Sequence, residues 1–293
     1  MNRIVYVNGE YVEEEHAKIS VFDRGFLFAD GVYEVSSVLQ GKLIDNQGHL
    51  TRLKRSLSEL AMEAPATDDT IQQIQSALIE KNKLHEGLVY LQVTRGAADR
   101  DFAYPDGVKP SLVMFTQSKN VIDNPQALTG IAIITTPDIR WQRRDIKTTG
   151  LLAPCMAKML AKSAGADDAW MVEDGFITEG SSNNAYIIKQ DGTLVTRQLG
   201  TEILAGITRR AILKLAAEGS IRIEERPFSI EEAHNAAEAF ISSATAFVMP
   251  VTSIDGKKIG HGNPGKLTRK LREIYIQTAL RSVGGVQKRY KHL

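Results

Sequence analysis

Apolar residues recur at two spacings along this chain, and the two spacings predict a mixture of strands and helices. Residues 4–7 and 11–12 are β-branched or aromatic and flank Asn8-Gly9, the pair that a type I′ turn prefers, so they predict a β-hairpin. In residues 49–62, leucines recur every three or four positions, which predicts an amphipathic helix. The same patterns predict helices over 67–81, 151–164, 208–218 and 266–281, and strands over 35–39, 42–44, 88–94, 111–115, 131–135, 169–172, 185–189, 193–196 and 239–242.

The order of these elements predicts an α+β protein with two lobes and largely antiparallel strands. A polar stretch containing Asn124-Pro125 separates the two halves of the pattern. We therefore expect an N-terminal α+β lobe over 1–120, an interdomain linker over 121–130 and a C-terminal α+β lobe over 131–293. No period of 20–50 residues repeats, which excludes solenoids and propellers.

Composition places the chain among globular proteins. It has 293 residues, of which 43% are hydrophobic and 24% charged, so it is not a disordered chain. With 36 basic against 35 acidic residues the net charge is +1, which argues against nucleic-acid binding through bulk electrostatics. The one basic cluster, at 288–292, is expected to be a solvated tail.

Cysteine content and hydropathy indicate the compartment. The single Cys155 excludes an intramolecular disulfide and fits a reducing cytoplasm. No apolar run approaches the roughly 20 residues of a membrane helix, and the first residues lack a signal-peptide core. We therefore expect a soluble cytoplasmic protein without a membrane partner.

The common catalytic signatures are absent from the sequence. It contains no Walker loop, no Gly-x-Gly-x-x-Gly after a predicted strand, no His-Glu-x-x-His and no Gly-x-Ser-x-Gly. None of the six histidines lies at metal-ligand spacing from another His or Cys, so no metal site is predicted.

Four polar segments instead flank predicted strands or helices. They are Lys147 before the helix at 151–164, the run Thr178-Glu179-Gly180-Ser181-Ser182-Asn183, the helix start Gly206-Ile207-Thr208-Arg209, and Ser242-Ser243-Ala244-Thr245. Taken singly, the first three have plain structural readings as a surface lysine, a turn and a helix N-cap at Thr208. Together they offer an amine, a carboxylate and loops for an anion, the set that pyridoxal phosphate requires. Its ring withdraws electrons when a carboxylate keeps the pyridine nitrogen protonated, and the amine must lose its proton to attack.

At these residues the sequence resembles the fold-type IV pyridoxal-phosphate enzymes, and among them the D-amino acid aminotransferases. The matching segments run along nearly the whole chain: Tyr6-Val7-Asn8-Gly9, Asp23-Arg24-Gly25-Phe26, Asp30-Gly31-Val32-Tyr33-Glu34-Val35, His49-Leu50-Thr51-Arg52-Leu53, Gln92-Val93-Thr94-Arg95-Gly96, Asp138-Ile139-Arg140-Trp141, Asp145-Ile146-Lys147, Thr178-Glu179-Gly180-Ser181-Ser182-Asn183 and Gly206-Ile207-Thr208-Arg209. The resemblance implies a smaller N-terminal α/β lobe and a larger C-terminal lobe with mainly antiparallel strands, with the cofactor in the cleft between them.

The resemblance also implies roles for individual residues. Lys147 would form the internal aldimine and carry the proton, and Glu179 would pair with the pyridine nitrogen. The remaining cofactor-binding residues would be Arg52, Ile207, Thr208, Ser243 and Ala244 at the phosphate, Leu204 on the ring face, Ser182 beside the cofactor and Arg140 behind Glu179. Without the resemblance, Arg52 is expected to be a solvated helix arginine.

Substrate recognition is where the sequence departs from the family pattern. Tyr33 and Arg100 stand where the family binds the substrate α-carboxylate, but Phe102 replaces the expected histidine. An arginine alone can still bind a carboxylate through two parallel hydrogen bonds. In this family the loop bearing Arg100 comes from the neighbouring subunit, so the resemblance implies a homodimer.

The function implied is a ping-pong transamination from a D-amino acid such as D-alanine to a 2-oxo acid such as 2-oxoglutarate, through a pyridoxamine form. Phe102 leaves open an (R)-selective amine transaminase or a mixed activity. The cofactor motifs also leave open a branched-chain aminotransferase and aminodeoxychorismate lyase. The remaining alternative, a non-catalytic binding protein, is disfavoured by the presence of Lys147.

Overall fold

The computed structural model describes residues 3–284, so the basic cluster at 288–292 lies outside the described residues. The chain divides into two compact units, Met1–Asn120 with Ile146–Gly150, and Val121–Asp145 with Leu151–Leu293. Residues 121–130, expected as a linker, belong to the second unit and contain the short helix α4. The segment that carries Lys147 is part of the first unit, although the sequence around it belongs to the second.

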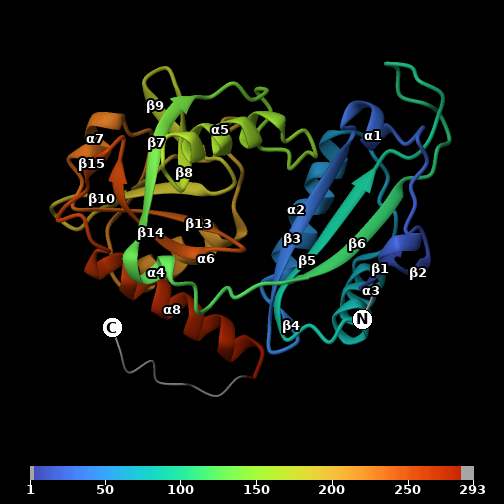
Figure 1. Ribbon diagram of the computed structural model, residues 1–293, viewed down its shortest axis with the longest axis horizontal. Coiled ribbons are helices and arrows are strands. Elements are labelled where there is room, and N and C mark those ends of the chain that lie inside the picture. The colour runs from blue at the N-terminus through green and yellow to red at the C-terminus, as the bar shows by residue number, and fades with distance from the viewer. Residues whose placement is uncertain (1–2, 285–293) are drawn as a thin grey trace. The chain divides into compact units, whose positions relative to one another are not determined.

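The first unit is built on one antiparallel sheet of six strands in the order β2-β1-β6-β5-β3-β4 (Figure 1). Its elements are β1 (Ile4–Val7), β2 (Glu10–Glu13), η1 (Glu14–His16), α1 (Arg24–Phe28), β3 (Gly31–Leu39), β4 (Lys42–Leu43), α2 (Asn46–Glu59), α3 (Asp68–Lys81), β5 (Glu86–Thr94) and β6 (Ser111–Ser118). The leucine positions of α2 and the apolar positions of α3 form one core with alternate residues of the sheet, including Val32, Leu91 and Met114. Because side chains alternate along a strand, Glu34 lies on the same helix-covered face as Val32, and Tyr33 lies on the opposite face.

Local sequence signals explain the turns and helix ends of this unit. Asn8 and Gly9 both have positive φ, 48° and 109°, as the predicted type I′ hairpin between β1 and β2 requires. Gln40 and Gly41 also have positive φ and connect β3 to β4, so the strands predicted over 35–39 and 42–44 form a second hairpin. The Thr67 hydroxyl accepts a hydrogen bond from Thr70 N at 3.2 Å and caps α3, as expected for its sequence.

The second unit is larger and has a mixed sheet (Figure 1). Its elements are α4 (Gln126–Thr129), β7 (Ile131–Pro137), α5 (Leu152–Ser163), β8 (Asp168–Glu173), β9 (Phe176–Gly180), β10 (Asn184–Ile188), β11 (Leu194–Thr196), α6 (Ile207–Glu218), β12 (Ile223–Glu225), α7 (Ile230–His234), β13 (Glu238–Ser243), β14 (Phe247–Ile254), β15 (Lys257–Lys258) and α8 (Lys266–Ser282). The strand order is β12-β11-β10-β13-β14-β7-β8-β9, with β15 beside β14. Three neighbouring pairs are parallel (β7 with β8 and with β14, and β11 with β12) and the others are antiparallel. The predicted α+β class with largely antiparallel strands is thus confirmed.

Two parts of the second unit differ from the sequence prediction. Thr178 and Glu179, interpreted singly as turn residues, lie inside the buried strand β9, because their neighbours pair with β8. Strand β14 was not predicted, and it contains Pro250 between two strand neighbours. Proline within a run argues against a strand, and here the register of β14 against β7 shifts just after it, between Val251 and Ser253. No helix within residues 3–284 is both long enough and apolar enough to span a bilayer.

Candidate active site

The segment Ile146–Gly150 runs beside the start of β3 and fixes Lys147 next to Tyr33. Tyr33 N donates to Lys147 O at 2.9 Å, and Thr149 N donates to Gly31 O at 3.0 Å. The Lys147 ammonium lies 4.2 Å from the centre of the Tyr33 ring. Among the described residues, Lys147 Nζ makes no hydrogen bond or ion pair, so this lysine is held by its backbone and its amine is not neutralised by a carboxylate.

Arg52 belongs to a buried cluster rather than to the solvated surface of α2. Its Nε and Nη2 donate to the two oxygens of Glu34, each at 2.7 Å, and His49 Nδ1 lies 2.7 Å from Glu34 Oε2. Arg52 is 8% exposed and Glu34 is 2% exposed. The expectation of a solvated arginine is therefore wrong, because Glu34 on β3 provides a bidentate partner across the helix–sheet core.

Charge pairing outweighs burial at Glu34. Burial alone raises the pKa of this carboxyl, since it penalises the ionised form. The Arg52 guanidinium and the His49 ring, through charge and hydrogen bonds, overcome that effect and lower the pKa of Glu34 to about 2. Glu34 is therefore ionised at neutral pH and fixes the direction of the Arg52 side chain.

Glu179 has a comparable environment in the second unit. Its carboxylate accepts from Arg140 Nη1 at 2.5 Å, from Asn184 Nδ2 at 3.0 Å and from Leu204 N at 3.2 Å. Arg140 also donates to both oxygens of Asp138, at 3.0 and 2.7 Å. Burial lowers the pKa of Arg140, but hydrogen bonds and charge from Asp138 and Glu179 raise it above its ordinary value, so the cation persists. The structure thus brings Glu179, Leu204 and Arg140 together, three residues that the resemblance places around the cofactor ring.

The start of α6 docks against this glutamate cluster. The N-cap of α6 is Gly206, with no side-chain cap, so the interpretation of Thr208 as the N-cap is wrong. A Cβ at Gly206 would lie 2.1 Å from Asn184 Oδ1, which explains the glycine at this close approach. Ile207 and Thr208 therefore occupy the first helical turn, where backbone N–H groups lack intrahelical acceptors and favour an anion.

The loop segments that carry the other predicted residues are each fixed by hydrogen bonds. Asp168 accepts from Ser181 Oγ at 2.5 Å and from Asn183 Nδ2 at 2.9 Å, so the turn that exposes Ser182 is held on both sides. At the end of β13, the Ser243 hydroxyl accepts from Ala246 N at 3.1 Å and shapes the turn that contains Ala244.

The two predicted substrate-binding residues, both in the first unit, contact different neighbours. Tyr33 contacts Lys147, whereas Arg100 lies in the loop between β5 and β6, against the rings of Phe28 and Phe102. No hydrogen bond or ring contact joins Arg100 to Tyr33 within residues 3–284. Phe102 itself is largely exposed, with 79% of its surface accessible.

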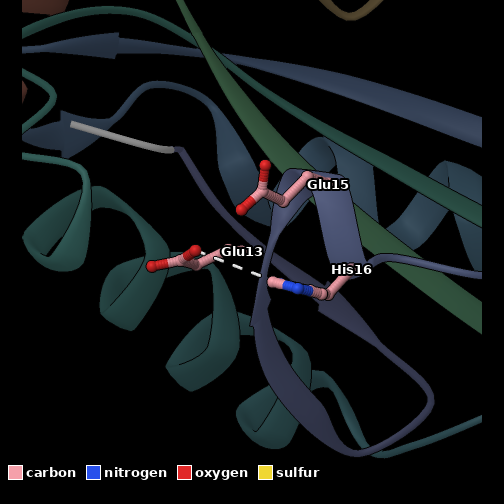
Figure 2. Close-up of side chains that lie close together, drawn as sticks. All are labelled: Glu13, Glu15 and His16. Carbon is pink, nitrogen blue, oxygen red and sulfur yellow. Dashed lines mark ion pairs between the residues drawn. The ribbon is translucent and has the colours of Figure 1, made fainter.

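Glu13, Glu15 and His16 form a small exposed group at the end of β2 (Figure 2). His16 Nδ1 lies 3.9 Å from Glu13 Oε2, and the ligand atoms of the three residues lie close enough together to hold a metal ion. None of these three residues takes part in the clusters described above.

Sequence reasoning did not identify four residues that hold the predicted ones: Glu34 and His49 around Arg52, Asn184 beside Glu179, and Arg24 at the Arg100 loop. The spacing of His49 and Arg52, three apart on one helix, was a usable signal that both face the same way. Nothing in the sequence indicated that the residue facing them is Glu34, because that contact joins a helix to a strand.

Comparison with known protein families identifies the class of this protein. The family model for amino-transferase class IV matches residues 31–254, and the chain belongs to this family. One relative, the D-alanine aminotransferase of Staphylococcus epidermidis, is 40% identical over 280 residues, covering 94% of this chain and 98% of its own. The D-alanine aminotransferase of Bacillus licheniformis is 38% identical over 278 residues, covering 95% of this chain and 96% of its own.

Solved structures show the same fold. The branched-chain amino acid aminotransferase of Escherichia coli superposes with a TM-score of 0.89 at 23% identity, covering 99% of this chain and 98% of its own. The branched-chain aminotransferase of Thermoproteus uzoniensis superposes with a TM-score of 0.86 at 24% identity, covering 96% of both chains. Aminotransferases of this fold use pyridoxal 5′-phosphate, and another similar structure, a branched-chain enzyme, contains its pyridoxamine form.

Proposed function

We propose that this protein is a pyridoxal 5′-phosphate-dependent transaminase that moves the amino group of a D-amino acid such as D-alanine to a 2-oxo acid such as 2-oxoglutarate. The observation that carries the proposal is the fixed, unneutralised amine of Lys147 beside Tyr33, in a chain about two-fifths identical over nearly its whole length to D-alanine aminotransferases.

The donor groups of the chain fit this cofactor. When bound, pyridoxal phosphate supplies an electron-withdrawing ring that weakens the bonds at the substrate Cα. Lys147 would hold its aldehyde end and Glu179 its pyridine nitrogen. The remaining groups would be Leu204 and Ser182 at the ring, and Arg52, Ile207, Thr208, Ser243 and Ala244 at the phosphate.

Glu179 suits a protonated ring nitrogen because it accepts hydrogen bonds from Arg140 and Asn184, which favour its ionised form. Leu204 N donates to the same carboxylate at 3.2 Å and favours its ionised form further. Arg140 in turn is held by Asp138, which keeps the guanidinium directed at Glu179.

Lys147 Nζ is the group that moves the proton. In its neutral form it would take the proton from the substrate Cα and, once protonated, would deliver it to the cofactor carbon C4′; the second half-reaction would move a proton in the opposite direction. Tyr33 and Arg100 would bind the α-carboxylate, Arg100 through two parallel N–H donors.

We also propose that the protein forms a homodimer. Large apolar side chains are exposed in both units: Ile19, Val21 and Phe22 in the first, and Leu152, Met159 and Leu160 along α5 in the second. Apolar surface of this kind marks protein–protein interfaces. A mass measured by light scattering during size exclusion should be twice 32.3 kDa, and a monomer mass at micromolar concentration would contradict the dimer. The single Cys155 is consistent with action in a reducing compartment such as the cytoplasm.

The direct test of the reaction is turnover with D-alanine and 2-oxoglutarate, followed as pyruvate formation. Lys147→Ala should abolish turnover, since it removes the amine that lies against the Tyr33 ring, while Lys214→Ala, at an exposed lysine of α6 paired with Glu218, should leave turnover unchanged. Turnover of Lys147→Ala at the wild-type rate would refute the proposal.

A second candidate function, (R)-amine transamination, is favoured by one observation, the apolar Phe102 beside Arg100. Comparing D-alanine with (R)-1-phenylethylamine as donors distinguishes the two. Faster reaction with the amine would favour the second candidate. Reaction with L-leucine but not with D-alanine would indicate a branched-chain enzyme, and pyruvate release from aminodeoxychorismate without an acceptor would indicate a lyase.

A further inference from the structure

We propose that Arg24 and Phe28 of α1 are positioning residues for carboxylate recognition, because they fix the loop and the guanidinium of Arg100. The inference rests on the proposed function and deepens it: it explains how one arginine can recognise a D-amino acid where Phe102 replaces a second donor.

The loop that carries Arg100 has no regular secondary structure of its own between β5 and β6. Residues 99–102 are all exposed, so the loop needs anchors elsewhere to present Arg100 in one direction. An arginine on an unanchored loop would lose conformational entropy on binding each substrate and would bind it more weakly.

Arg24 is the anchor of the loop backbone. It is 3% exposed, and its Nη1 donates to Asp101 O at 2.6 Å and to Ala103 O at 3.3 Å. These two carbonyls lie on either side of Phe102. Arg24 therefore fixes the chain immediately after Arg100 from inside the unit.

A second charged residue fixes Arg24. Its Nε donates to Asp30 Oδ2 at 2.8 Å, and the same carboxylate accepts from Arg95 Nε at 2.8 Å. The Arg95 guanidinium carbon lies 3.5 Å from the centre of the Tyr104 ring, further along the same loop. The two buried arginines, Arg24 and Arg95, thus hold the loop at Asp101, Ala103 and Tyr104.

Phe28 connects this anchor to Arg100 itself. The guanidinium carbon of Arg24 lies 4.6 Å from the centre of the Phe28 ring, and that of Arg100 lies 5.2 Å from it. Phe102 completes the arrangement, since its ring lies 5.6 Å from Phe28 and 5.4 Å from the Arg100 guanidinium carbon.

Stacking and hydrogen bonding use different parts of a guanidinium. Aromatic rings contact its flat face, whereas a carboxylate binds the N–H groups at its edge. Within residues 3–284, Arg100 makes no hydrogen bond or ion pair, so its N–H groups remain available to a substrate. Phe28 and Phe102 thus orient the Arg100 guanidinium without occupying its N–H groups. A histidine at position 102 would instead offer a hydrogen-bond donor of its own.

The test compares two donors that differ only in the group that Arg100 would bind. D-alanine has a carboxylate, whereas D-alaninol has a hydroxymethyl group at the same Cα configuration. The specificity constant of the first half-reaction is measured for each, from the absorbance change of the holoenzyme, in Arg24→Lys, Phe28→Leu and Arg100→Ala. Arg3→Lys, an exposed arginine paired with Glu14, and Phe176→Leu, an exposed ring of β9, serve as matched controls.

We expect the ratio of the two constants to fall at least tenfold in Arg24→Lys and Phe28→Leu, through a higher dissociation constant for D-alanine with the limiting rate of the half-reaction changed less. The controls should keep the wild-type ratio. If Arg100→Ala lowers the ratio but Arg24→Lys and Phe28→Leu do not, the positioning role is wrong while the proposed function stands. Equal losses with both donors in these two variants would also overturn it, because a general structural defect does not distinguish a carboxylate from a hydroxymethyl group. Absence of any reaction of the wild-type holoenzyme with D-alanine would instead refute the proposed function.

Discussion

Two buried glutamates, one in each unit, meet arginine in opposite ways. Glu34 on β3 fixes an arginine: its two oxygens hold Arg52 in a bidentate pair, with His49 beside them. Glu179 on β9 is instead fixed by an arginine, since Arg140 is bound to Asp138 and donates one N–H to Glu179. The first arrangement directs the Arg52 cation, as binding a phosphate requires. The second directs the Glu179 carboxylate, as binding a protonated ring nitrogen requires.

The largest effect is expected from neutralising the second glutamate. Glu179→Gln keeps the shape, leaves Arg140 with Asp138 as its charged partner, and removes the charge that we propose faces the ring nitrogen. A loss of about 3 kcal/mol of transition-state stabilisation at the ring nitrogen would lower kcat more than about 100-fold.

The measurement is kcat with saturating D-alanine. The matched control is Glu173→Gln, which removes a glutamate of the neighbouring strand β8 that pairs with Arg144. A Glu179→Gln enzyme within threefold of the wild-type kcat would break the proposed contrast between the two glutamates.

Neutralising the first glutamate should act on affinity more than on chemistry. Glu34→Gln removes the charge that directs Arg52, so the dissociation constant of pyridoxal phosphate should rise about tenfold, the equivalent of about 1.4 kcal/mol. The constant is measured by fluorescence titration of the apoprotein. A wild-type dissociation constant for pyridoxal phosphate combined with a strongly reduced kcat would show that Glu34 does not act by directing Arg52.

Acid should weaken the first unit through the same glutamate. The folded pKa of Glu34, about 2, lies below its ordinary value of 4.5, so this carboxylate contributes stability above about pH 4.5 that is lost as the pH falls towards 2. The difference corresponds to about 3 kcal/mol at 1.4 kcal/mol per pKa unit. Melting temperatures of the wild type and of Glu34→Gln should therefore approach each other as the pH falls from about 5 towards 2. Parallel curves over that interval would show that Glu34 does not titrate as its partners imply.

Much of the fold was predictable because its signals are local. Asn8-Gly9 specifies a hairpin through the positive φ values that these residues tolerate, and Thr67 specifies the start of α3 through its hydroxyl. Strand β14 was not predictable, because its Pro250 argues against a strand and only its neighbours in the sheet determine that it forms one.

The residues of the candidate site also differ in how far a local sequence signal predicts them. The presence of Lys147 and Glu179 could be interpreted from the chemistry of the cofactor once the resemblance was recognised. Their supports could not, since Glu34 meets Arg52 across 18 residues, and Arg24 reaches the carbonyl of Asp101 across 77. Contacts of this separation depend on how helices and loops pack, which a local pattern does not encode.

The central claim is that the amine of Lys147 bonds to the aldehyde of the cofactor. Reducing the holoenzyme with borohydride makes that bond permanent, and peptide mass spectrometry then locates the added phosphopyridoxyl group. The account predicts one such group per chain, on the peptide that contains Lys147. A group found on another lysine, or on none, would contradict it.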